Sequence, residues 1–145
     1  MEQWKKIIHI NRNFQKAVNL QLDIGNHGRI ENYIPTRSSM LILQRYLEAV
    51  LGKTKEHATV LIGPYGKGKS HLLLVLLSIL SLDLPTSVFE KINKTDENTA
   101  ELVLQIQQEN KKYLPVLVSS ISGFSMNQIL LFALREALEK NGLAD

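Results

Sequence analysis

One octapeptide constrains this chain more than any other segment. It reads Gly63-Pro64-Tyr65-Gly66-Lys67-Gly68-Lys69-Ser70 and matches the pattern G-x-x-x-x-G-K-[ST] at every position. The short run over residues 57–62 that precedes it is apolar and β-branched, and residues 70–82 that follow it are apolar almost all round. These surroundings predict a buried strand, a glycine-rich loop and a helix packed between layers.

The residue types in this loop suit the binding of phosphate groups. Its three glycines permit positive φ angles and close approach to the backbone, so successive amides can converge on phosphate oxygens at the positive end of the following helix. Lys69 is expected to place its ammonium group on the β and γ phosphates, and the Ser70 hydroxyl to ligate the Mg²⁺ that bridges them. Lys67, at a variable position, faces either phosphate or solvent.

Residues 63–70 resemble the Walker A loop of the P-loop NTPases. The wider arrangement is similar to the N-terminal part of large bacterial AAA-like ATPases, including those of anti-phage operons. In this arrangement Tyr33-Ile34-Pro35-Thr36, a helix and a strand come before the loop, and His71 comes after it. The resemblance implies ATP and Mg²⁺ as ligands, residues 63–71 as the nucleotide-binding set and Ser70 as the Mg²⁺ ligand. It also implies residues 34–36 as neighbours of the adenine, although a strand end followed by a helix cap is the simpler interpretation of these three.

The segment before the loop carries the pattern of a hairpin and a helix. Residues 18–24 alternate between apolar and polar types, residues 25–28 supply turn chemistry, and together with residues 29–34 they predict a β-hairpin. Thr36 is expected to cap a helix whose apolar face ends before Gly52.

The segment after the loop carries a second set of signals. Residues 83–98 contain Pro85 and a polar run over residues 91–98, which is typical of a loop, and residues 99–112 predict a helix. Residues 113–119 have the apolar centre of a parallel strand, and Pro115 places that strand at a sheet edge because proline lacks an amide donor.

A last helix is predicted near the end of the sequence. Ser125 and Gln128 form a capping box, an apolar stripe follows, and Gly142 stands where a C-terminal cap belongs. The order of elements predicts an α/β fold, in which a partial P-loop NTPase parallel sheet with flanking helices follows a β-hairpin and a helix.

Two regions are expected in this organisation. Residues 1–56 form the N-terminal hairpin and helix region, and residues 57–145 form an incomplete P-loop nucleotide-binding core. The strands over 57–63 and 113–119 either pair directly through a right-handed crossover or leave exposed edges.

The sequence lacks the acidic strand that P-loop hydrolysis requires, four apolar residues followed by Asp or Asp-Glu. Residues 80–83 end in Asp but close the predicted loop helix, and residues 20–23 end in Asp but alternate and lie before the loop. Arg135 lies inside a helix, where an exposed salt bridge is the default role for arginine. We therefore expect the chain to bind ATP without measurable hydrolysis.

Two kinds of function fit these features. The chain is either the N-terminal portion of a larger ATPase, with further protein subunits or a C-terminal part as partners, or a nucleotide-binding or protein-interaction module without catalysis. Residues 1–70 carry a net charge of +6 and residues 71–145 one of −3, so nucleic acid is a further candidate partner, although a solvated surface explains the imbalance equally well. Trp4, beside two lysines, suits either stacking on a base or packing.

The remaining composition argues for a cytoplasmic protein without a membrane partner. There is no cysteine, so disulfides and thiolate metal sites are excluded. Residues 1–13 lack the apolar core of a signal peptide, and residues 72–82 fall short of the roughly 20 apolar residues that a bilayer requires. The histidines lie too far apart in sequence to predict a metal site, at His9, His27, His57 and His71.

Overall fold

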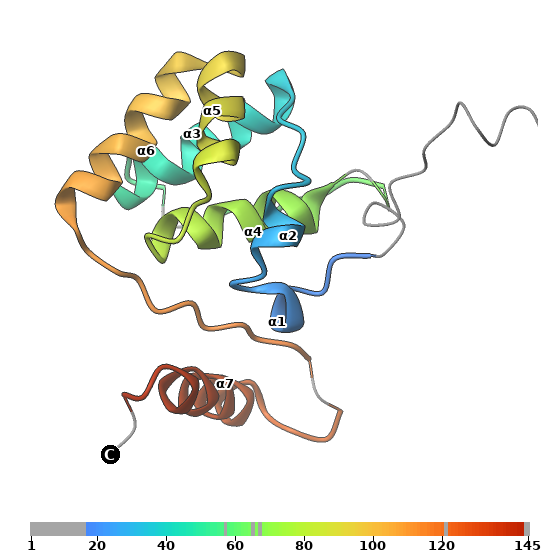
Figure 1. The fold of residues 1–145 in the computed structure, drawn as a ribbon. Coiled ribbons are helices and arrows are strands. Elements are labelled where there is room, and N and C mark those ends of the chain that lie inside the picture. Colours follow the sequence, from blue (N-terminus) through green and yellow to red (C-terminus); the bar gives the residue numbers. More distant parts are fainter. Residues whose placement is uncertain (1–16, 57, 65, 67, 121, 144–145) are drawn as a thin grey trace, which may run out of the picture.

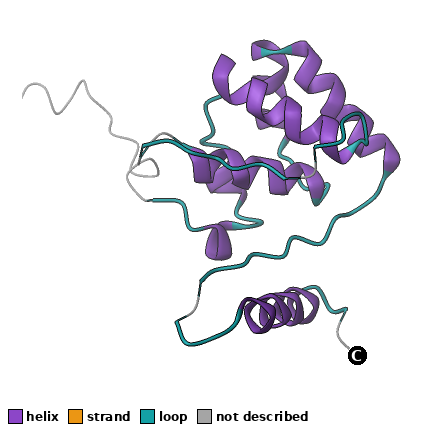
Figure 2. Cartoon of the chain, turned by 180° about the vertical axis from the view of Figure 1, so that it is seen from behind, coloured by secondary structure: helices purple, strands orange, loops and turns teal. Residues whose placement is uncertain are grey.

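The computed structural model describes residues 17–56, 58–64, 66, 68–120 and 122–143, and in these residues it contains seven helices and no strand (Figure 1). The helices are α1 (Leu20–Asp23), α2 (His27–Ile30), α3 (Arg37–Val50), α4 (Lys69–Leu80), α5 (Thr86–Thr95), α6 (Glu97–Glu109) and α7 (Met126–Lys140). The predicted α/β fold is therefore wrong. The parallel sheet on which P-loop NTPases and AAA-like ATPases are built is absent from the described chain, as the colouring of Figure 2 shows.

Helix α4 is the centre of the fold, as its all-round apolar sequence predicted. It contacts α1 and α2, and it also contacts α3 and α6. Its buried side chains therefore point in several directions, at Leu72, Leu74, Val75, Leu76, Ser78 and Ile79. One hydrophobic cluster joins side chains from α2 through to α6, so residues on both sides of position 57 share a core.

Helices α3, α5 and α6 pack against one another beside α4. The start of α3 is confirmed, because Thr36 accepts from the Ser39 amide and the Ser39 hydroxyl accepts from the Thr36 amide. Helix α6 ends three residues earlier than predicted. Asn110 adopts a positive φ of 52°, a left-handed conformation that asparagine tolerates and that commonly ends a helix.

The predicted β-hairpin over residues 18–34 is wrong, since the structure has two short helices there. The Asn19 side chain accepts from the backbone two residues on, and the Asn26 side chain accepts from the backbone three residues on. Such local bonds begin a helical turn in preference to a strand. Burial is also opposite to the pattern, because Leu22 is 79% exposed whereas Asp23 is buried.

Neither predicted strand forms. Residues 58–62 and 113–119 are extended but have no ladder of backbone hydrogen bonds within the described chain, and they do not pair with each other. Val60 and Ile62 are 81% and 89% exposed, so this apolar run lies on the surface. An apolar run becomes a strand only when a neighbouring segment satisfies its amides and carbonyls, which no described segment does here.

Helix α5 lies where the sequence predicted a loop over residues 83–98. Pro85 stands at its N-cap, and Val88 and Ile92, one helical turn apart, are fully buried. The polar residues that surround this pair obscured the helical spacing. Two buried side chains are sufficient because α5 packs on both α3 and α6.

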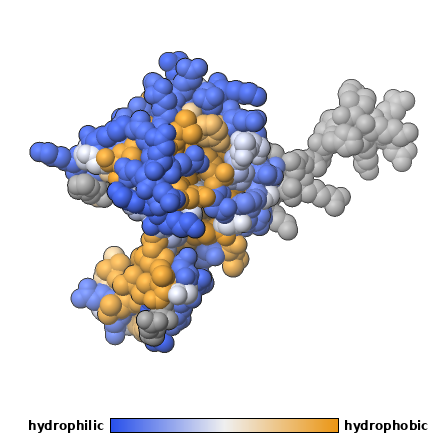
Figure 3. Space-filling model, turned by 60° about the vertical axis from the view of Figure 1, so that its left-hand side comes forward, coloured by the Kyte–Doolittle hydropathy of each residue, from blue (hydrophilic) through white to orange (hydrophobic). Residues whose placement is uncertain are grey.

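Helix α7 lies apart from the other helices, beyond the extended segment 111–120 (Figure 1). Its predicted ends are confirmed: Ser125 and Gln128 form the capping box, and Gly142, with φ of 66°, ends the helix. Figure 3 shows an apolar surface over this part of the molecule. Its exposed members are Phe124, Met126, Leu130, Leu131, Phe132 and Leu134. None of the described helices combines the length and the apolar character needed to cross a bilayer.

Candidate functional site

The glycine-rich loop leads directly into the first turn of α4. Gly66 and Gly68 both have φ of 78°, which is the conformation that glycine was expected to supply there. Gly63 does not have a positive φ, so its backbone conformation does not require a glycine. Tyr65 and Lys67 lie outside the described residues.

The N-terminus of α4 has no side-chain cap among the described residues. Its N-cap is Gly68, which has no side chain to satisfy the first amides. The first intrahelical hydrogen bond runs from the Leu72 amide to the Gly68 carbonyl oxygen, at 2.9 Å. The amides of residues 69–71 precede that bond, and they carry the positive end of the helix dipole.

The Lys69 side chain folds back over the loop. Its ammonium group donates to the carbonyl oxygens of Gly63, at 2.7 Å, and Pro64, at 2.8 Å. Both acceptors are neutral and exposed. A phosphate oxygen carries charge and makes a stronger, charge-assisted bond, so it can displace them. The ammonium group is thus held at the mouth of the loop, next to the open helix end.

Ser70 is the expected Mg²⁺ ligand, and it is exposed in the first turn of α4. Among the described residues, no group of three histidine or acidic side chains could hold a metal ion. Mg²⁺ commonly keeps several waters and is bound by few protein groups together with substrate phosphates. One hydroxyl therefore fits Mg²⁺ that arrives with a nucleotide, and it does not fit a metal held by the protein alone.

Asp23 and Asp83, which the sequence analysis excluded as catalytic acids, are bonded to other residues. The Asp23 carboxylate accepts from the Asn19 amide at 2.8 Å and pairs with Arg29 at 3.6 Å. Asp83 pairs with His27 at 2.9 Å. On α7 the Arg135 guanidinium donates to Glu139 at 2.7 Å, which is the exposed salt bridge that was expected of it.

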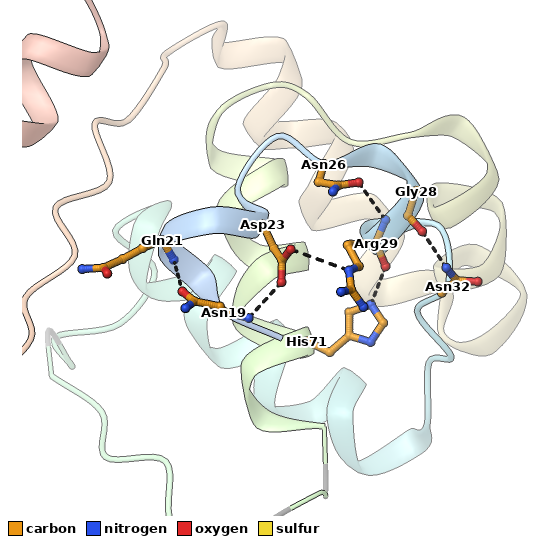
Figure 4. A network of polar contacts seen from close by, with 8 residues as sticks. All are labelled: Asn19, Gln21, Asp23, Asn26, Gly28, Arg29, Asn32 and His71. Carbon is orange, nitrogen blue, oxygen red and sulfur yellow. Dashed lines mark hydrogen bonds and ion pairs between the residues drawn. The ribbon is translucent and has the colours of Figure 1, made fainter. Parts of the chain in front are cut away.

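The backbone of His71 lies in the first turn of α4, next to the loop, and its side chain points toward α2 (Figure 4). Its Nε2 lies 2.9 Å from the Arg29 carbonyl oxygen, and because a carbonyl only accepts, Nε2 is the protonated, donating nitrogen. Burial lowers the pKa of His71, and the bond to the Arg29 carbonyl opposes this shift only in part. The ring is therefore neutral near pH 7.

Tyr33, which directly precedes the residues implied as adenine neighbours, lies beside the first turn of α4. The buried Tyr33 ring packs edge to face on His71, with ring centroids 5.3 Å apart. Burial raises the pKa of Tyr33, opposed by the nearby Ser39 hydroxyl. That hydroxyl donates to the Thr36 carbonyl oxygen, and the Tyr33 hydroxyl has no hydrogen-bond partner in the described part of the chain. Ile34 is 64% exposed.

One motif was missed from the sequence. Residues 93–96 read Asn-Lys-Thr-Asp, the Asn-Lys-x-Asp pattern that GTPases use to read guanine. In the structure the Asp96 carboxylate accepts from the amide and the hydroxyl of Thr99 and so caps α6. Because that carboxylate is already bonded, the motif here serves the helix start.

The other candidate features add no described residue to the loop. Trp4, His9 and His57 fall outside the described residues. A cavity of about 400 Å³ is lined by α7, residues 112–117, Gln21, Ile24 and Ser81, and no described residue of the loop lines it. The sequence analysis also did not identify the contacts of Arg29. A local sign in the sequence is Asn26, whose side chain caps the helix that contains Arg29.

Comparison with known proteins does not assign this site. No protein-family model, no curated protein and no solved structure matches the chain. What the loop can bind is therefore inferred from its own residues.

Proposed function

We propose that residues 63–70, together with the open N-terminus of α4, bind the triphosphate of a nucleotide, ATP with Mg²⁺. The observation that carries the proposal is the position of the Lys69 ammonium group, held by the Gly63 and Pro64 carbonyls at the mouth of a loop that ends on an uncapped helix. A cation, the amides of a first helical turn and the positive helix end are the donors that a polyphosphate requires.

Each part of the loop has a separate task in this proposal. The amides of residues 69–71 donate to phosphate oxygens, and the left-handed backbone at Gly66 and Gly68 lets the chain turn without a Cβ in the way. The Lys69 ammonium group exchanges its carbonyl partners for phosphate oxygens. Ser70 supplies its hydroxyl to the Mg²⁺ that arrives with the nucleotide, and Mg²⁺ neutralises part of the phosphate charge.

The chain acts in this proposal as the ATP-binding, N-terminal portion of a larger ATPase. Hydrolysis needs a carboxylate near the metal and a positioned water. The Asp23 carboxylate accepts from Asn19 and the Asp83 carboxylate pairs with His27, so the remainder of the ATPase would supply the acid. A cytoplasmic location goes with this proposal, because nucleoside triphosphates are abundant there.

Isothermal titration calorimetry with ATP, with and without Mg²⁺, tests the proposal. Lys69→Ala is expected to weaken ATP binding by roughly 10- to 100-fold, because it removes a charge-assisted contact to phosphate. Lys53→Ala is the matched control, since the Lys53 ammonium group donates to the Gln105 side chain on the surface. Equal affinity of wild type and Lys69→Ala would overturn the proposal.

Ser70→Ala separates the metal from the phosphate cradle. It is expected to reduce the gain in affinity that Mg²⁺ gives while leaving metal-free ATP binding near the wild-type value, because only a metal ligand is lost. A parallel titration with GTP tests which base the site prefers. Tighter binding of GTP than of ATP, lost in Asp96→Ser, would show that residues 93–96 read the base.

A further inference from the structure

His71 attaches the loop helix to the N-terminal part of the chain. Its backbone belongs to the first turn of α4, and its amide is one of those that precede the first intrahelical hydrogen bond. Its side chain donates to the Arg29 carbonyl oxygen at 2.9 Å (Figure 4). The same ring packs on Tyr33. One residue therefore contacts both the proposed phosphate site and the segment that holds α2.

The segment on the other side of this bond is tied together internally. Arg29 pairs with Asp23 through side chains that are 19% and 11% exposed, so solvent screens the pair little. The second Asp23 carboxylate oxygen accepts from the Asn19 amide, and the Asn26 side chain accepts from the Arg29 amide. A shift of the Arg29 carbonyl is therefore transmitted to α1 as well as to α2.

We propose that His71 is a positioning residue that couples phosphate binding at residues 63–70 to the order of residues 19–33. The inference rests on the proposed function. Binding fixes the first turn of α4, and the His71 side chain passes that constraint to the Arg29 carbonyl. Coupling between two sites is reciprocal, so displacement of residues 19–33 weakens phosphate binding by the same factor.

A second histidine provides the matched control. His27, at the start of α2, pairs with Asp83 at 2.9 Å, through side chains that are about half exposed. Asp83 follows the C-terminal end of α4, so this contact joins the same segment to the end of α4 remote from the loop. His27→Leu therefore loosens α2 without touching the first turn of α4.

Hydrogen–deuterium exchange of the full chain, with and without saturating ATP and Mg²⁺, tests the coupling. In wild type and in His27→Leu, ATP is expected to slow exchange in residues 20–33 as well as in residues 63–72. In His71→Leu the slowing is confined to residues 63–72, and ATP affinity falls about fivefold to tenfold, the effect of one partly buried hydrogen bond. His71→Gln restores both, because its amide can donate from the position of Nε2.

His71→Asn replaces the leucine variant if that one does not fold, because its shorter amide cannot reach the Arg29 carbonyl. Slowing over residues 20–33 that persists in His71→Leu or His71→Asn would overturn the coupling. Slowing confined to residues 63–72 in wild type would overturn it without any variant, and would leave the proposed function intact. No slowing and no heat of binding in wild type would overturn the proposed function and the coupling together.

Discussion

The Lys69 side chain lies across Gly63. Its Nζ is 2.7 Å from the Gly63 carbonyl oxygen, and its Cδ is 3.8 Å from where a Cβ on Gly63 would stand. That is an ordinary contact distance, and Gly63 does not have a positive φ. Gly68 has a positive φ but no described atom near its Cβ position. The two glycines therefore constrain the loop for different reasons.

Gly68→Ala and Gly63→Ala are expected to differ in stability. Gly68→Ala forces a Cβ into the left-handed region and lowers the free energy of unfolding by about 1–2 kcal/mol. Gly63→Ala stays within about 0.5 kcal/mol of wild type, because its Cβ fits beside Lys69. Urea denaturation measures both. The reverse order would show that the loop has another conformation.

Ile92→Ala tests whether residues 86–95 are the helix α5. Ile92 is fully buried, so the substitution is expected to cost about 2–5 kcal/mol of unfolding free energy. Leu104→Ala, on the exposed side of α6, is the control and costs far less. If residues 83–98 were a surface loop, as the sequence predicted, the two substitutions would cost the same small amount.

His71 makes stability depend on pH. Its pKa in the folded protein is lower than the ordinary value near 6.5, so the unfolded chain binds more protons in this range. Its contribution is therefore complete above pH 6.5 and is lost as the pH falls through 6.5 toward the folded-state pKa. Chemical denaturation between pH 5 and pH 8 should show a steeper loss for wild type than for His71→Gln, which cannot titrate. Parallel curves would contradict this.

The purified chain is expected to bind ATP without turning it over. Among the described residues, no cluster of acidic and histidine side chains stands ready to hold the metal, and a missing transition-state cation alone costs roughly 10³- to 10⁵-fold in rate. A continuous phosphate-release assay should give the same rate for wild type and Lys69→Ala. Steady release that Lys69→Ala abolishes would show that a catalytic carboxylate is present.

Local signals predicted the helices whose ends depend on neighbouring residues. The helix cap at Thr36 and the capping box at Ser125 act over three residues, so caps of this kind can be recognised in sequence, and both predicted caps were confirmed. The strand predictions failed because a strand depends on a partner elsewhere in the chain. Residues 58–62 have the composition of a strand, but no described segment pairs with them.

In the candidate site, too, the features that depend on neighbouring residues could be predicted and the contact between distant residues could not. The left-handed glycines and the open start of α4 follow from a single contiguous stretch of sequence, and they lie where that stretch indicated. The bond between His71 and the Arg29 carbonyl joins positions 42 residues apart, and its acceptor is a backbone atom. A carbonyl oxygen is the same in every residue type, so no sequence pattern could have identified it.

The helix that begins at the loop is also the helix around which the core is built. A ligand that binds only the folded chain adds to its stability by mass action, and at 100 times its Kd the addition is about 2.7 kcal/mol. If the loop binds ATP as proposed, the nucleotide would act as a folding cofactor for this protein. The folded fraction of the chain would then fall as ATP becomes scarce.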